Sequence, residues 1–171
     1  MKKLGLFFGL SLMTAVAVAE PAPFGLEMGK ATVDDLKAKY SAELTGVNKY
    51  SLGPMYQLRP GQLGVSGLQK ATAIFDSGNK LVAVLTEMPK SKFDQMHQAL
   101  SSKYRVVSKQ IPFVGNKKVV MEDGETEITL DAPHMSFEME MNYINKSFYE
   151  SFRRISEEEK RQKRQQEMGN L

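Results

Sequence analysis

Hydrophobic and polar residues alternate most regularly near the carboxyl end of the chain. Between residues 135 and 143, every odd position is Met, Phe or Tyr and every even position is polar. Strict alternation of this kind predicts a strand with one buried side and one solvent-facing side. We therefore expect the odd-numbered side chains of this segment to pack in the core.

Two earlier segments follow the periodicity of a helix instead. Thr32, with Asp35 three residues later, predicts the capped start of a helix over 32–41. Ser91 is predicted to cap a second helix, whose apolar stripe runs through 93–104. Both helices have a single apolar side, so each is expected to pack on one face of a sheet.

A third helix is predicted from about Lys146 to the end of the chain. It begins amphipathic and becomes polar on every side after Ser156. A helix that is polar all round has no core to join, so this one is expected to project or fray.

Short apolar runs separated by turn residues predict the other strands. Residues 76–79 join two apolar runs and predict a hairpin in the centre of the sheet, which Pro89 ends. Asp123-Gly124 predicts another hairpin. The expected strands are 45–51, 54–58, 71–75, 81–85, 105–111, 117–121 and 126–130.

The chain also matches itself weakly after a shift of 60 residues, which superimposes the first two predicted helices. Either a duplicated helix-plus-sheet module, with repeats 24–86 and 87–145, or shared capping and periodicity rules explain the match. We expect an α+β domain over 20–152, with antiparallel sheet and helices packed on one face. A protruding polar helix or tail over 153–171 follows it.

The first 19 residues have the parts of a secretory signal. Lys2 and Lys3 precede an apolar run that ends in Ala17-Val18-Ala19. This run is shorter than the about 20 residues of a spanning helix, which favours a cleaved signal over a retained anchor. No cysteine follows for lipid attachment. We expect a periplasmic protein, with secretion into the medium as the alternative.

Composition narrows the classes of function. Without Lys2 and Lys3, the chain has 21 basic and 20 acidic side chains and no basic cluster, so nucleic-acid binding is not expected. The absence of cysteine excludes thiol catalysis, disulfide exchange and thiolate metal sites. The absence of tryptophan weakens the case for sugar stacking.

Residues 24–36 carry a resemblance to known proteins. Phe24 and Gly25, followed by Gly29 and Thr32, precede a short helix with acidic and apolar residues. This stretch resembles small bacterial envelope modules of the type of the assembly lipoprotein BamE and the β-lactamase inhibitor protein. The resemblance implies helices on an antiparallel sheet and a non-enzymatic module that binds another protein. The chain lacks the lipid-accepting cysteine of the first and the disulfides of the second.

The sequence contains only two histidines, His97 and His134, and neither belongs to a nucleophile or zinc motif. His97 could act as a general base or a pH sensor, but its place on an apolar stripe favours a boundary residue. We therefore predict no catalytic residues, no cofactor and no enzymatic activity.

A cluster of soft ligands is the most specific chemical candidate. His134, Met135, Met139 and Met141 offer the imidazole and thioether groups that suit Cu(I). Methionine is also an adaptable core filler, and the alternation over 135–143 favours burial of these side chains.

Three further segments are interpreted as structural. The glycine-rich loop lacks the Gly-Lys-[Ser/Thr] ending of a phosphate loop, although its side chains could touch a partner. The acidic cluster fits no calcium loop and is expected to be solvated. The polar tail could dock, but a solvated helix end is favoured. The residues concerned are Arg59, Gly61, Gln62, Leu63, Gly64 and Gly67 in the loop, Glu122, Asp123, Glu125 and Glu127 in the cluster, and 157–167 in the tail.

Together these observations predict an exported binding or accessory protein that acts through contacts with another envelope protein. No nucleic acid and no stable membrane anchor after signal cleavage are expected. A periplasmic carrier of a small ligand or Cu(I) is the alternative, and a hydrolase with an unrecognised site is a third.

Overall fold

The computed structural model describes residues 19–169, so the predicted signal peptide lies outside the described residues except for Ala19. A single antiparallel sheet has the spatial order β1-β2-β3-β4-β8-β7-β6-β5. Its strands are β1 (Ala42–Val47), β2 (Leu52–Leu58), β3 (Lys70–Asp76), β4 (Leu81–Pro89), β5 (Arg105–Gln110), β6 (Lys117–Asp123), β7 (Thr126–Ala132) and β8 (Glu138–Asn145). The helices are α1 (Val33–Lys39), α2 (Phe93–Ser101) and α3 (Lys146–Gly169), with short 3-10 turns η1 (Pro23–Gly25), η2 (Pro60–Gln62) and η3 (Lys90–Lys92).

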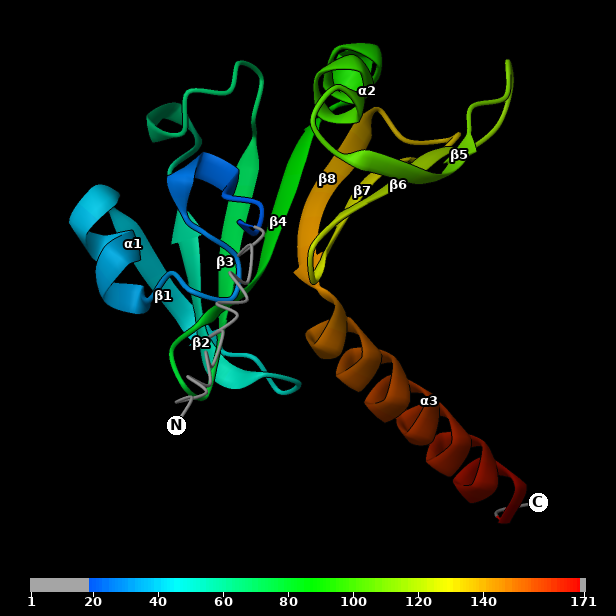
Figure 1. Ribbon diagram of the computed structural model, residues 1–171. Coiled ribbons are helices and arrows are strands. Elements are labelled where there is room, and N and C mark those ends of the chain that lie inside the picture. The colour runs from blue at the N-terminus through cyan, green and yellow to red at the C-terminus, as the bar shows by residue number, and fades with distance from the viewer. Residues whose placement is uncertain (1–18, 170–171) are drawn as a thin grey trace, which may run out of the picture.

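The chain has two halves, and each consists of a helix followed by four consecutive antiparallel strands of the sheet. The helix α1 precedes β1–β4, and α2 precedes β5–β8. The two helices begin at Val33 and Phe93, 60 residues apart, as the self-match predicts. The last strands of the two halves, β4 and β8, pair with each other and join the halves into one sheet (Figure 1). The predicted α+β fold is therefore confirmed, and the helix-plus-sheet order occurs twice.

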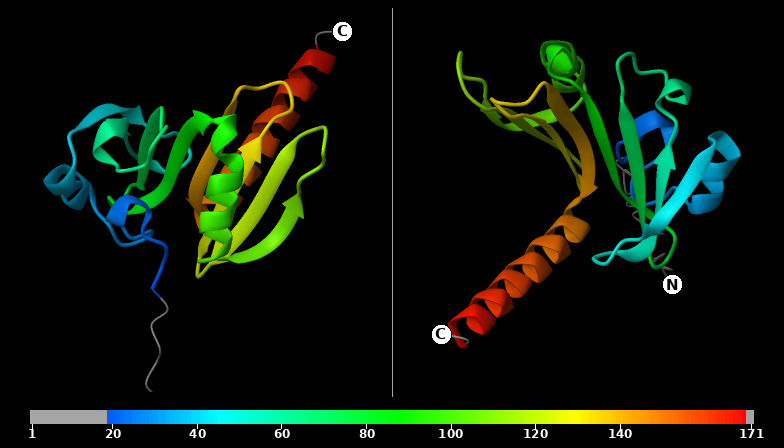
Figure 2. Two further views of the ribbon diagram at one scale, coloured as in Figure 1. Left: turned by 90° about the horizontal axis from the view of Figure 1, so that it is seen from above. Right: turned by 180° about the vertical axis from the view of Figure 1, so that it is seen from behind.

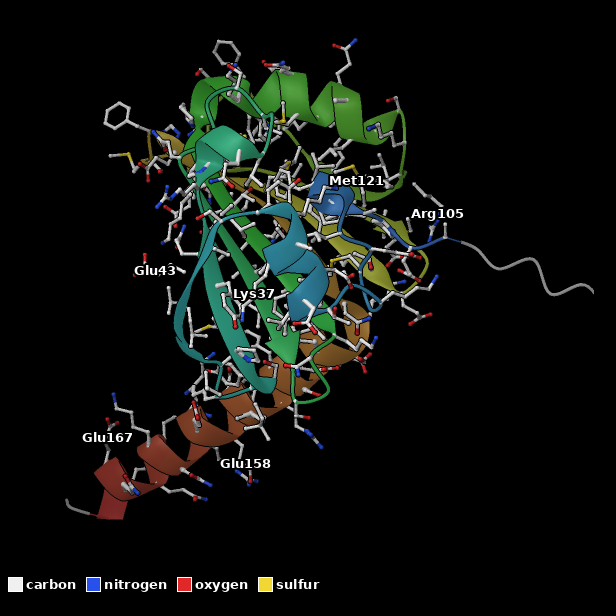
Figure 3. All side chains as sticks on the ribbon, turned by 90° about the vertical axis from the view of Figure 1, so that its left-hand side faces the viewer. Lys37, Glu43, Arg105, Met121, Glu158 and Glu167 are labelled. Carbon is white, nitrogen blue, oxygen red and sulfur yellow. The ribbon has the colours of Figure 1, made fainter. Side chains whose placement is uncertain are left out.

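One face of the sheet, here called the covered face, packs against α1, α2 and the segment that precedes α1. Leu36 of α1 and Phe93 of α2 are buried in the same core cluster as Met121, which lies inside the molecule in Figure 3. The start of α1 is fixed by the predicted capping box. Asp35 N donates to Thr32 Oγ1, and Thr32 N donates to Asp35 Oδ2. Thr32 Oγ1 also donates to Asp35 Oδ2, and this hydrogen bond, followed by the one from Thr32 N, lowers the pKa of Asp35.

The predicted strand over 135–143 is wrong in its first part. The strand β8 begins at Glu138, and Met135 and Phe137 are 90% and 94% exposed. Pro133 ends β7, and the chain makes a turn in which Ser136 N donates to Pro133 O. The alternation holds only from Met139 onward, where the odd-numbered side chains are buried.

Two local predictions also differ from the structure. Ser91 does not cap α2, because residues 90–92 form the turn η3 and Phe93 N donates to the carbonyl of Lys90. The strand predicted over 45–51 ends at Val47, because Asn48 Oδ1 accepts from the N–H groups of Tyr50 and Ser51 and closes a turn.

The helix α3 starts at Lys146 as predicted and leaves the sheet on the side opposite α2 (Figures 1 and 2). Its far end projects away from the strands, with Glu158 and Glu167 pointing into solvent (Figure 3). Among residues 19–169, none of the helices combines the length and apolarity that a membrane crossing requires.

Candidate functional site

The other side of the sheet, here called the open face, is not covered by α1 or α2. Strand register sorts its side chains into three rows that run across the sheet. The row nearest α3 is apolar on β2, β3, β4 and β8, the middle row is mostly neutral, and the third row is charged. The rows are Met55, Ile74, Ala83 and Ile144; Gln57, Thr72, Leu85, Asn142, Thr129; and Lys70, Glu87, Glu140, Asp131, Lys118.

The apolar row ends in a crevice beneath the first turns of α3. This crevice has a volume of about 180 Å³ and is lined almost entirely by carbon. Ile74, Leu85 and Ile144 form its floor, and Phe148 and Phe152 of α3 form one wall. The volume is below the range of about 300–1,000 Å³ that is typical of small-molecule pockets. The crevice therefore suits one inserted side chain better than a carried ligand.

The turn between β1 and β2 holds α3 over the open face. The ring of Tyr50 meets the ring of Phe152 edge-on at a centroid distance of 4.8 Å. Lys49 Nζ lies 2.8 Å from Glu159 Oε2. Hydrogen bonds from Ser156 and then Lys49 lower the pKa of Tyr50. The first half of the chain thus positions a helix that belongs to the second half.

The charged row places three carboxylates on adjacent strands. Glu87 and Glu140 face each other across β4 and β8, and Glu140 faces Asp131 across β7. Like charges directly opposite each other destabilise a sheet. A lysine relieves each outer carboxylate, with Lys70 Nζ 2.9 Å from Glu87 Oε1 and Lys118 Nζ 3.4 Å from Asp131 Oδ2. Glu140 lies between these pairs and has no ion pair among the described residues.

A polar hollow of about 120 Å³ opens between the middle and charged rows, at the seam of β4 and β8. Its lining includes Asn142, which is buried although it lies on the open face. Asn142 Oδ1 accepts from Thr86 N, and its Nδ2 donates to Glu140 Oε2 at 3.0 Å. These bonds fix the carboxylate of Glu140 at the rim of the hollow.

The edges of the sheet are less suited to binding than its face. The strand β1 has an irregularity between Leu44 and Gly46, and β5 has one between Val106 and Ser108. Bulges on edge strands oppose pairing with another strand. Addition of a partner strand is therefore disfavoured at both ends of the sheet.

The structure separates the sulfur and imidazole ligands proposed for Cu(I). Met139 and Met141 are buried under the helices, whereas His134 and Met135 are exposed in the loop before β8. His97 is half-buried on α2, with its ring stacked on Phe93. In the described part of the chain, no three His, Cys, Asp or Glu side chains gather as metal ligands.

Glu122 of the acidic cluster and two residues of the glycine-rich loop make contacts within the fold. Glu122 Oε2 lies 2.7 Å from Arg105 Nη2 and 3.3 Å from Lys146 Nζ, so its charge is used within the fold. In the loop, Leu63 is buried in the core and Gln62 Oε1 accepts from Ser41 N. Leu63 is therefore not available to a partner, contrary to the sequence-based expectation.

Sequence reasoning missed the open face. It identified the polar side of β8 but could not align that side with Glu87 and Asp131, which come from other strands. No family model, curated protein or solved structure matches this chain.

Proposed function

We propose that this chain is a non-enzymatic accessory protein of the bacterial envelope that binds another protein on its open face. The row of three carboxylates carries the proposal. The facing of Glu140 with Glu87 and Asp131 costs stability, and breaks of local rules of this kind are expected mainly at functional sites. The predicted signal peptide supports export.

The chemistry of the open face favours a cationic partner. Glu138 and Glu140 are exposed on neighbouring open-face positions of β8 and add negative charge beyond the ion pairs of the row. The pKa of Lys70 is raised, first by its hydrogen bond to Glu87 and to a smaller extent by the charges of Glu140 and Glu138. An arginine or lysine of the partner would enter the hollow and donate to Glu140.

The crevice supplies the second contact. Ile144 lies four residues from Glu140 on the same strand, which is about 14 Å at the rise of a strand. An extended partner segment would therefore place an aliphatic or aromatic side chain in the crevice about four residues from its cationic side chain. Protein interfaces typically combine apolar contacts in their core with polar contacts at the rim.

Selection from a random peptide library on the immobilised protein tests this partner chemistry. We expect enrichment of peptides with Arg or Lys about four residues from Leu, Ile, Phe or Tyr. The substitution Glu140→Lys should abolish this enrichment, whereas Glu167→Lys makes the same charge change on the projecting end of α3 and should preserve it. Enrichment of acidic peptides, or equal enrichment on both variants, would overturn the proposal.

A further inference from the structure

Two loops at the same end of the β5–β8 half carry the three most exposed large apolar side chains among residues 19–169. Residues 111–116 join β5 to β6, and residues 133–137 join β7 to β8. In consecutive antiparallel strands, these two connections lie at one end. Phe113 is fully exposed and Val114 is 66% exposed. Together with Met135 and Phe137 they are here called the apolar tips.

The apolar tips are held in place by hydrogen bonds. His134 N donates to Asn116 Oδ1 at 2.8 Å and so links the two loops. Lys90 N donates to Phe137 O, and Lys90 Nζ donates to the carbonyls of Pro133 and His134. Because the loops are already ordered, contact with a partner costs little further backbone entropy.

Lysines outnumber the acidic residues that directly flank the apolar tips, and Glu87 and Glu140 of the charged row border the base of the second loop beside Pro133 and Ser136. Neither loop contains an acidic residue, and five lysines flank the loops or lie on the adjoining turn η3. Asp94 Oδ1 lies 3.9 Å from Lys117 Nζ, and Asp131 Oδ2 lies 3.4 Å from Lys118 Nζ. Glu138 adjoins Phe137 in the sequence. The lysines are Lys90, Lys92, Lys109, Lys117 and Lys118.

We propose that the apolar tips insert reversibly into the surface of an anionic lipid bilayer. Protruding side chains on two separate loops match a fluid interface, which deforms around them, better than a rigid protein surface, which would need two fitted pits. Aromatic side chains partition into the bilayer interface, and nearby lysines are attracted to anionic headgroups. The apolar tips border the charged row of the open face, to which Lys118 belongs, but insertion into a bilayer does not depend on the partner proposed there.

The absence of tryptophan from the chain gives a direct test. Phe113→Trp and Phe137→Trp each create a single tryptophan at an apolar tip. With vesicles of phosphatidylcholine and phosphatidylglycerol in equal parts, we expect the emission of each to shift to shorter wavelength and to be quenched by brominated lipid chains. Val47→Trp is the control, because Val47 is exposed at the opposite end of the sheet and should show no shift.

Further variants separate lipid binding from misfolding and self-association. Phe137→Ser is expected to lower the vesicle partition coefficient of Phe113→Trp by about tenfold, with an unchanged circular dichroism spectrum. Val114→Trp replaces either reporter that fails to fold. No shift at any tip reporter with anionic vesicles would overturn the proposal. So would a shift without vesicles that grows with protein concentration, since it would assign the tips to self-association.

Discussion

On β7, Ile128 and Leu130 point to the covered face and are fully buried, whereas Thr129 and Asp131 point to the open face and keep part of their surface in water. The same strand thus contributes to two surfaces with different physical demands. The covered face gains its free energy from apolar burial, which tolerates almost no change of shape. The open face combines a polar hollow and a row of like charges, which add little to stability, with a smaller apolar cluster that includes Ile74 and Ala83 beside the crevice. The covered face thus supplies most of the buried core, and the open face is the surface that we propose for recognition.

The largest expected effect comes from removing side chains on the two faces of β7. Ile128→Ala should lower the free energy of unfolding by about 2–5 kcal/mol because it leaves a cavity in a closed core. Thr129→Ala, its neighbour on the open face, should change the free energy by less than about 0.5 kcal/mol. Urea denaturation measures both. Similar losses for the two variants would mean that the open face is also structural.

Substitution in the crevice is expected to change stability by an intermediate amount. Phe152→Ala removes the edge-on contact with Tyr50 and should cost about 1–2 kcal/mol, because the side chain is partly exposed at its site. Amide hydrogen exchange should then rise in α3 but not in β3 or β7. Phe152→Leu should restore much of the protection, and failure to do so would show that aromatic contact, rather than filling of the crevice, holds the helix.

A rise to alkaline pH should reduce the contribution of Tyr143 on the covered face to stability and increase that of Tyr50 beside the open face. Burial raises the pKa of Tyr143 on the covered face, so the unfolded chain ionises first and stability falls as pH rises past about 10. By pH 11 this costs about 1 kcal/mol, which Tyr143→Phe should remove. The pKa of Tyr50 is lowered, so its contribution is lost as pH falls, and Tyr50→Phe should steepen the alkaline loss. Equal slopes in all three proteins would contradict the assignment.

The smallest expected change in the free energy of unfolding tests most sharply whether the charged row is structural. Glu140→Gln should raise the free energy of unfolding by about 0.5 kcal/mol, because it removes the like-charge contacts with Glu87 and Asp131. It should also weaken partner binding. Glu43→Gln, on the edge strand β1, is a matched control that should change neither. A loss of stability in Glu140→Gln would show that the charged row is structural.

Local signals in the sequence predicted the local structure well. The capping box of Thr32 and Asp35 and the turns at 76–79 and 123–124 depend on residues close in sequence, and each occurs as expected. The failures at Ser91 and at Met135 arise where a turn overrides the pattern. Alternation alone could not show that Pro133 delays the start of β8.

The candidate site was beyond sequence reasoning for a different reason. Glu87 and Glu140 are 53 residues apart, and they meet only because β4 pairs with β8 in a fixed register. A shift of one residue would turn Glu140 toward the covered face. The exposed residues of a predicted strand can be identified from the sequence, but their neighbours on other strands cannot.

Photo-cross-linking in the native cell tests the central claim most directly. A photoreactive phenylalanine at Thr129 lies on the open face, and the same group at Lys37 lies on α1, on the covered side (Figure 3). We predict one discrete adduct from Thr129, absent from Lys37, lost with Glu140→Lys, and joined to a partner segment with a cationic side chain. An adduct from Lys37 alone, or one from Thr129 that survives Glu140→Lys, would contradict the assignment of binding to the open face.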